Sequence, residues 1–295
     1  MYKLIAIDLD GTLLNSYGQI SEKNKNALQK AKKEGVEIVL ASGRSTNSVK
    51  NIASDLQIGN YIICGNGSLI YDLQKNEIIY DKFIDQKKVL QIIKICEENS
   101  IYYNIYTEKM VIAKTLNNNV LFYHQENASK PENKKTKINL VQDIYQYIQQ
   151  VQGENVLKIT ISDNDNIIFN SIIRKLREIK NIDVLDVAHM SRKMIKSGTE
   201  DVSIEYFYTE ITNENVDKWY AIEHLLGITN IQKEEVMAIG DNVNDKIMIE
   251  NAGIGIAMGN SAPYIKEIAD KVVANNNEDG VAEAIEKYAQ INNNN

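Results

Sequence analysis

The sequence has very little cysteine, proline and histidine. Among its 295 residues there are two cysteines, two prolines and three histidines. Because Cys64 and Cys96 show no CxxC or Cys/His spacing, we expect neither a disulfide framework nor a zinc site. Hydrophobic residues make up 43% and charged residues 25%, which is typical of globular domains and excludes a disordered or collagen-like chain.

Long apolar runs and blocks of basic residues are also absent. No run reaches the roughly 18 apolar residues of a membrane-spanning helix, and the apolar start meets Asp8 too early for a signal peptide. We therefore expect a cytoplasmic protein without a membrane partner. Lys and Arg number 33 against 40 Asp and Glu, so the formal charge of −7 argues against a nucleic-acid partner.

Short apolar strands alternate with helices near both ends of the chain, a pattern that is typical of βα units. Between about residues 83 and 211 this alternation is lost, and Tyr-rich strands mix with helices and polar insertions. The pattern predicts the α/β class, with a doubly wound, Rossmann-like parallel core formed by residues 1–82 and 212–295. Residues 83–211 would form an inserted α+β domain.

Polar and acidic residues follow the predicted strands of the core. In open parallel sheets, ligands bind outside the carboxyl ends of the strands, so these residues outline a site. They are Asp8–Thr12, Ser42–Arg44, Gly65–Gly67 and Gly240–Asp245. The four carboxylates in this set would repel one another unless a cation neutralised them. Because the ligands are oxygens, without His or Cys, the sequence predicts Mg²⁺ at this edge of the sheet.

Several short motifs stand in a fixed order along the chain. They are Asp8-Leu9-Asp10-Gly11-Thr12-Leu13-Leu14, Ala41-Ser42-Gly43-Arg44, Asn66-Gly67, Glu210-Ile211 leading to Lys218, Gly240-Asp241-Asn242-Val243-Asn244-Asp245 and Glu278-Asp279-Gly280-Val281-Ala282. In this order they resemble the haloacid dehalogenase (HAD) superfamily, in its Cof-like branch of hydrolases with an inserted C2-type cap. The resemblance covers essentially the whole chain, and it implies a Mg²⁺-dependent phosphatase whose cap, residues 83–211, selects the substrate.

The resemblance implies catalytic roles for four residues. Asp8 would be the nucleophile that forms an aspartyl-phosphate, and Asp10 would be the general acid and base. Residues two apart in a strand share a face, so both carboxylates can address one phosphoryl group. Ser42 would hydrogen-bond the phosphoryl oxygens, and Lys218 would neutralise their charge.

A metal site and substrate contacts are implied in the same way. Mg²⁺ would be held by the Asp8 carboxylate, the Asp10 carbonyl and Asp241, with Asp245 binding through a water. Substrate contacts are assigned to Gly11, Thr12, Gly43, Arg44, Asn66 and Asn244. For Arg44 two interpretations stay open, a contact with the substrate phosphate and a pair with a surface carboxylate. The family commonly has a glycine after the motif lysine, whereas Trp219 stands here, which puts in question how closely this helix start approaches the substrate.

We therefore predict a HAD-type phosphoric monoester hydrolase that acts on a small phosphorylated metabolite, such as a sugar phosphate or a phosphorylated cofactor. Two alternatives stay open. A phosphomutase would use the same Asp8 chemistry and return the phosphoryl group to the substrate, and a sugar-phosphate sensor would bind without catalysis. Within the cap, His189–Lys196 is a candidate stretch for contacts with the leaving group, and the sequence carries no signal for an oligomeric state.

Overall fold

The computed structural model describes residues 2–128, 130–151, 153–185, 190–197 and 200–289, with the backbone alone for residues 190–197 and 200–205. The chain divides into two compact units. The first unit comprises Met1–Arg44, Val49–Asp81 and Asp217–Asn295, and the second comprises Ser45–Ser48 and Lys82–Val216. Within the described ranges, no helix combines the length and the apolar character that crossing a membrane requires.

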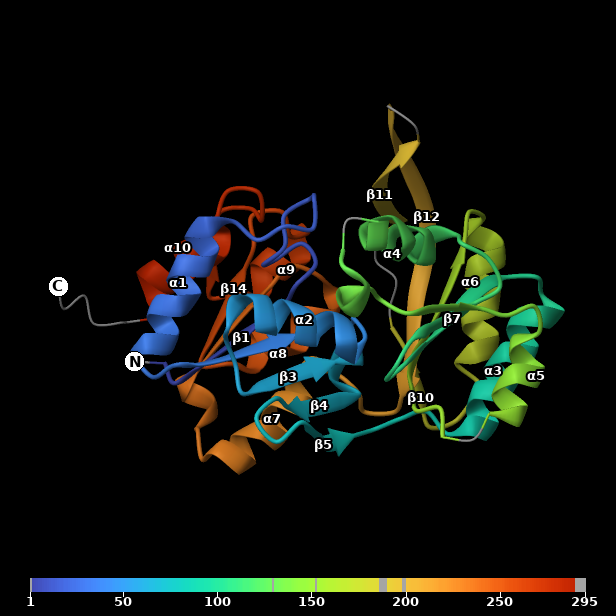
Figure 1. Ribbon diagram of the computed structural model, residues 1–295, viewed down its shortest axis with the longest axis horizontal. Coiled ribbons are helices and arrows are strands. Elements are labelled where there is room, and N and C mark those ends of the chain that lie inside the picture. The colour runs from blue at the N-terminus through green and yellow to red at the C-terminus, as the bar shows by residue number, and fades with distance from the viewer. Residues whose placement is uncertain (1, 129, 152, 186–189, 198–199, 290–295) are drawn as a thin grey trace. The chain divides into compact units, whose positions relative to one another are not determined.

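The first unit is built around an eight-stranded sheet (Figure 1). In spatial order its strands are β15 (Lys271–Val272), β14 (Ile254–Ala257), β13 (Val236–Gly240), β1 (Leu4–Ile7), β2 (Glu37–Ala41), β3 (Tyr61–Cys64), β4 (Leu69–Asp72) and β5 (Glu77–Asp81). Neighbouring strands from β15 to β3 are parallel, and β4 and β5 add an antiparallel hairpin at one edge. The predicted α/β class with a parallel core sheet is confirmed.

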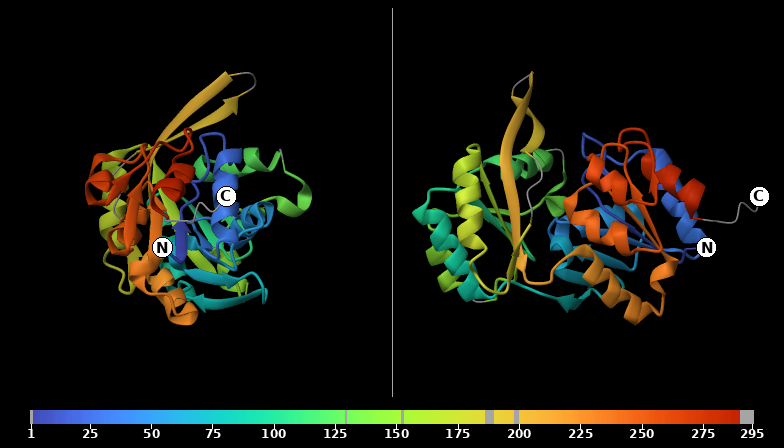
Figure 2. Two further views of the ribbon diagram at one scale, coloured as in Figure 1. Left: turned by 90° about the vertical axis from the view of Figure 1, so that its left-hand side faces the viewer. Right: turned by 180° about the vertical axis from the view of Figure 1, so that it is seen from behind.

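Helices cover both faces of this sheet (Figures 1 and 2). They are α1 (Glu22–Lys33), α2 (Thr46–Leu56), α7 (Lys218–Thr229), α8 (Lys246–Asn251), α9 (Pro263–Ile268) and α10 (Gly280–Tyr288). Leu225 of α7 and Met248 of α8 join strand residues such as Ala6 and Val39 in one buried apolar cluster. Helices α1 and α10 pack against each other on the opposite face. The sheet is therefore buried on both faces, as a parallel sheet requires.

The second unit has a seven-stranded, mostly antiparallel sheet. Its strands are β10 (Ile182–Val184), β12 (Glu200–Asn213), β9 (Val156–Asp163), β6 (Tyr102–Thr107), β7 (Val111–Ala113) and β8 (Ile138–Leu140) in spatial order, with β11 (Met190–Ser197) paired to β12. Its helices are α3 (Gln86–Glu98), α4 (Asn118–Ala128), α5 (Ile144–Gln150) and α6 (Asn166–Leu176). Helices α3, α5 and α6 pack on one face of the sheet, whereas α4 packs on the other. In β9 the apolar Ile159 and Ile161 face the three helices, so the polar residues that alternate with them, Lys158, Thr160 and Ser162, face the opposite side.

Candidate active site

Two neighbouring parallel strands, β1 and β13, end side by side at one edge of the first unit's sheet. The register pairs Ile7 with Ile239, so the residues that follow, Asp8 and Asp241, leave the sheet close together. From here the chain winds through β1, β2 and β3 in one direction and through β13, β14 and β15 in the other. Ligand sites in open α/β sheets lie at such a reversal of strand order, because the loops diverge there.

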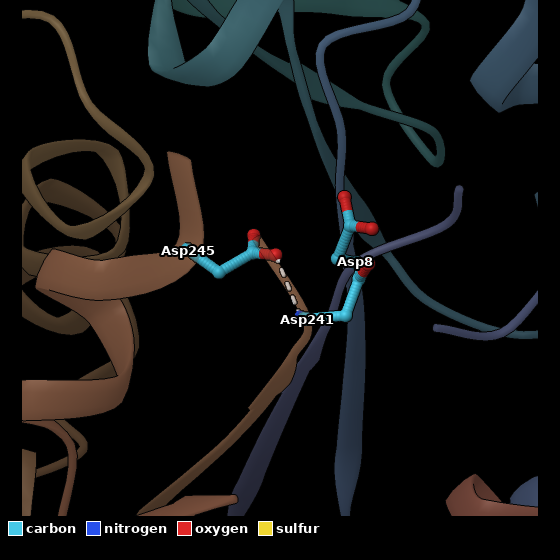
Figure 3. Close-up of side chains that lie close together, drawn as sticks. All are labelled: Asp8, Asp241 and Asp245. Carbon is cyan, nitrogen blue, oxygen red and sulfur yellow. Dashed lines mark hydrogen bonds between the residues drawn. The ribbon is translucent and has the colours of Figure 1, made fainter. Parts of the chain in front are cut away.

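Three carboxylates gather at this point (Figure 3). Each of Asp8, Asp241 and Asp245 has one carboxylate oxygen that lies within 4.8 Å of the corresponding oxygens of the other two. Burial and the Asp245 carboxylate raise the pKa of Asp8 to about 7, although Lys218 opposes this shift. Burial and the Asp8 and Asp245 charges likewise raise the pKa of Asp241 well above its ordinary value. The cluster therefore favours the binding of a cation, because a positive charge would offset the repulsion between the carboxylates.

Lys218 lies between two of these carboxylates and has no exposed surface. Its Nζ donates a hydrogen bond to Asp8 Oδ1 and another to Asp245 Oδ1, the second at 2.6 Å. Burial alone lowers the pKa of Lys218, but the two carboxylates outweigh it and raise the pKa above its ordinary value. The lysine is therefore a permanent cation in contact with the predicted nucleophile.

The start of α7 explains how Lys218 reaches this position. Asp217 caps the helix by accepting a hydrogen bond from the Tyr220 N–H at 2.9 Å. The loop after β3 packs directly on this helix start. Gly67 in this loop has φ +107°, and a Cβ at this position would overlap the Asp217 carbonyl, so the close approach requires glycine. Trp219 is only 4% exposed and packs into the apolar core beneath the helix. A tryptophan after the lysine is thus compatible with a close approach at the helix start.

Asp245 uses both of its carboxylate oxygens within the protein. Oδ1 accepts from Lys218, and Oδ2 accepts from the backbone N–H groups of Asp241 and Asn242 at 2.9 and 3.1 Å. A Cβ at Gly240 would overlap the Asp245 side chain, so this loop needs glycine at its start. Asp245 therefore fixes both the loop that carries Asp241 and the position of Lys218.

The loop after β1 folds onto Asp241. Thr12 Oγ1 donates to Asp241 Oδ1 at 2.9 Å, and Gly11 has φ +86°, where a Cβ would overlap the Asp241 carboxylate. Asn260 Nδ2 donates to the Gly11 carbonyl at 2.9 Å and to Asp241 Oδ2 at 3.4 Å. Asn260 was not among the predicted residues. It follows β14 at the same edge, so the strand-end argument that found the other loops also points to it.

Asp10 stands apart from the three clustered carboxylates. Its oxygens accept from Arg44 Nε at 2.8 Å and Nη2 at 2.7 Å, and its side chain is 53% exposed. Arg44 thus pairs with a carboxylate, that of Asp10, and its contact with the substrate phosphate stays a prediction.

The remaining predicted residues lie in the loops after β2, β3 and β13. Ser42 Oγ accepts from the Arg44 N–H at 3.2 Å, and Gly43 lies between the two. The Ser42 carbonyl accepts from the Asn66 N–H at 3.0 Å, and Asn244 Nδ2 donates to Asn66 Oδ1 at 3.2 Å. These contacts join three strand ends in one network. In the second unit, the side chains of His189–Lys196 lie outside the described residues.

Known proteins with related sequences and structures cover nearly the whole chain. The family described as haloacid dehalogenase-like hydrolase matches residues 5–285. The chain is 31% identical to phosphatase YwpJ of Bacillus subtilis, with 95% of this chain and 97% of that protein aligned. It is 28% identical to 5-amino-6-(5-phospho-D-ribitylamino)uracil phosphatase YcsE of the same species, over 97% of this chain and 95% of that protein. A solved haloacid dehalogenase-like hydrolase from B. subtilis has a TM-score of 0.80 at 28% identity, covering 97% of this chain and 99% of that one.

Proposed function

Because the chain belongs to the haloacid dehalogenase-like hydrolases, as its motifs predicted, and is a phosphoric monoester hydrolase of that family, we propose that it cleaves a small phosphorylated metabolite through an aspartyl-phosphate on Asp8. One observation carries the proposal. At the switch point of the parallel sheet, Asp8 contacts the buried Lys218 and lies beside the carboxylates of Asp241 and Asp245. Phosphoryl transfer needs such a nucleophile next to positive charge and oxygen ligands.

We propose Mg²⁺ as the cofactor. The donor set fits a hard divalent cation, because all three side chains offer oxygen and one oxygen of each lies within 4.8 Å of the others. Asp8 and Asp241 would ligate the ion with the Asp10 carbonyl. Asp245 would contact it through water, because its Oδ1 is held by the charged Lys218 and its Oδ2 by two backbone N–H groups. When bound, the ion stabilises the negative charge that develops on the phosphoryl oxygens.

In the first half-reaction, an oxygen of the Asp8 carboxylate attacks phosphorus, and the bond from phosphorus to the leaving oxygen breaks. Lys218 orients Asp8 through its hydrogen bond to Oδ1, and the other oxygen attacks. Ser42 donates its hydroxyl proton in a hydrogen bond to the phosphoryl group. Asp10, protonated when the substrate is bound, gives its proton to the leaving alcohol.

In the second half-reaction, water attacks the phosphorus of the aspartyl-phosphate. The Asp10 carboxylate takes a proton from this water, and the bond from phosphorus to Asp8 breaks. Inorganic phosphate leaves, Asp8 is again a carboxylate, and Asp10 again holds a proton. Lys218 balances the charge of Asp8 as it re-forms.

The substrate class is part of the proposal. A relative is named for its action on 5-amino-6-(5-phospho-D-ribitylamino)uracil, whose phosphate is carried by a sugar-like chain. We propose a sugar phosphate or a phosphorylated cofactor, selected by a cap formed by residues 83–211. The cytoplasmic location stays a prediction from the sequence.

The experiment is a measurement of phosphate release from a panel of phosphorylated metabolites with Mg²⁺, with Asp8→Asn as the blank. We expect the wild type to hydrolyse a few related esters and Asp8→Asn to hydrolyse none of them, while circular dichroism shows both proteins folded. EDTA should stop turnover, and added Mg²⁺ should restore it.

Four outcomes would contradict parts of the proposal. Substantial phosphate release by Asp8→Asn would remove Asp8 as the nucleophile. Turnover that survives EDTA would remove the metal. An isomerised phosphate ester in place of free phosphate would identify a mutase, and binding of esters without any turnover would identify a sensor.

A further inference from the structure

Arg44 and Asp10 form a two-point ion pair within the first unit. Arg44 Nε donates to Asp10 Oδ2 at 2.8 Å, and Nη2 donates to Oδ1 at 2.7 Å. The arginine side chain is 2% exposed, whereas that of Asp10 is 53% exposed. The carboxylate is therefore held from the protein side while much of it stays open to solvent.

The backbone of Arg44 is also fixed. Its N–H donates to Ser42 Oγ at 3.2 Å, and its carbonyl accepts from the Gly65 N–H at 3.2 Å. Arg44 is thus tied to the loops after β2 and β3. A buried guanidinium on a fixed backbone points its fork, the Nε and Nη2 donors, in one direction. A two-point contact between this fork and a carboxylate sets both the distance and the plane of the carboxylate.

We infer that Arg44 is a positioning residue for the reaction, which orients the Asp10 carboxylate and so acts on the departure of the leaving group. The inference rests on the proposed function, in which Asp10 gives a proton to the leaving alcohol. The alternative is that Arg44 grips the substrate phosphate. The contacts favour Asp10, because the Nε and Nη2 side of the fork already holds a carboxylate.

The two roles predict different responses to the leaving group. As Asp8 bonds to phosphorus, the bond from phosphorus to the leaving oxygen breaks, and that oxygen takes the proton of Asp10. A nitrophenolate departs as a stable anion without this proton, whereas a benzyl alkoxide needs it. A residue that acts through Asp10 therefore affects the benzyl ester most, and a phosphate-binding residue affects both esters alike.

The experiment compares 4-nitrobenzyl phosphate with 4-nitrophenyl phosphate, which are similar in size. The ratio of the two kcat/KM values is measured for wild type, Arg44→Lys, Asp10→Asn and the double variant, because kcat/KM covers the steps through loss of the leaving group. Lysine keeps the charge and removes the fork. Arg174→Lys, at an exposed position of α6, is the matched control, and Asp8→Asn is the blank.

We expect Arg44→Lys to lower kcat/KM for the benzyl ester about tenfold more than for the nitrophenyl ester. This is part of the roughly 10²–10⁴-fold that a general acid supplies. Arg44→Lys should change the ratio little in the Asp10→Asn background, and Arg174→Lys should leave it unchanged. Because the ratio compares two esters on one preparation, a smaller folded fraction cancels out of it.

Equal losses for the two esters, or a rise in KM for both with kcat unchanged, would overturn the positioning role and leave the proposed function intact. An additive effect of Arg44→Lys in the Asp10→Asn background would overturn it as well. Phosphate release by Asp8→Asn would instead refute the aspartyl-phosphate, and the role of Arg44 would fall with it.

Discussion

Replacing Lys218 with methionine tests whether the buried lysine holds the site together. Lys218 has no exposed surface and donates to both Asp8 and Asp245. Methionine fills a similar volume without the charge. The variant therefore leaves two buried carboxylates without their shared cation, and they must either remain as uncompensated charges or take up protons.

The cost follows from this loss of a partner. Removing one member of a buried ion pair destabilises a protein by about 3–5 kcal/mol. Each kcal/mol shifts the Tm of a large domain by roughly 2 °C, so we expect a fall of about 6–10 °C. Activity should fall by about 10²–10³-fold, the effect of removing one group that stabilises developing charge.

Thermal unfolding followed by circular dichroism in EDTA measures the stability, and phosphate release with Mg²⁺ measures the activity. Lys246→Met is the control, because Lys246 pairs with Glu250 at the surface, at 3.9 Å. Such pairs contribute at most about 1 kcal/mol. Adding Asp245→Asn to Lys218→Met should recover part of the stability, since one unpaired charge is removed. A Tm for Lys218→Met equal to that of Lys246→Met would refute the reasoning.

Three further predictions concern the same edge of the sheet. Gly11→Ala should lower kcat more than tenfold, because its Cβ would overlap the Asp241 carboxylate and φ +86° is unfavourable for alanine by about 1–2 kcal/mol; wild-type kinetics would contradict this. Gly67→Ala should lower the Tm by several degrees, because its Cβ would meet the Asp217 carbonyl, and an unchanged melting curve would argue against that close packing. In metal-free protein, the free energy of unfolding should fall by a few kcal/mol as pH rises from about 4 to about 7. Folded Asp8, with a pKa of about 7, holds a proton there that the unfolded chain has lost. Urea titrations at several pH values would show this, and a rise in stability over that range would give the opposite sign.

The sequence predicted the edge of the sheet on which the site lies. Apolar runs followed by Asp8, Ser42 and Gly240 mark strand ends, and parallel strands bring their carboxyl ends to one edge. This rule needs only the order of strands and helices along the chain. Which strand ends are neighbours is given by the observed order of strands in the sheet. Applied to one more strand, it would also have pointed to Asn260.

The pairing of side chains was beyond the sequence. Asp10 and Arg44 are 34 residues apart, and which carboxylate an arginine meets depends on the path of two loops and on side-chain rotamers. The approach of Lys218 depends on Gly67, which has no Cβ to keep the loop after β3 away from the start of α7. Trp219 is tolerated because its side chain turns into the core. None of these properties has a periodic pattern from which it could be read.

The charges of the described residues argue for a divalent ion at this site. Asp8, Asp241 and Asp245 bring three carboxylates together, and Lys218 contacts two of them. Asp10 and Arg44 pair with each other, so their charges balance separately. With all carboxylates ionised, two negative charges are left in a largely buried space, where unpaired charge is costly. One divalent cation would cancel that excess. Without a metal ion, burial and the neighbouring carboxylates raise the pKa of Asp8 and of Asp241, so that protons bind there more readily and reduce the same negative charge.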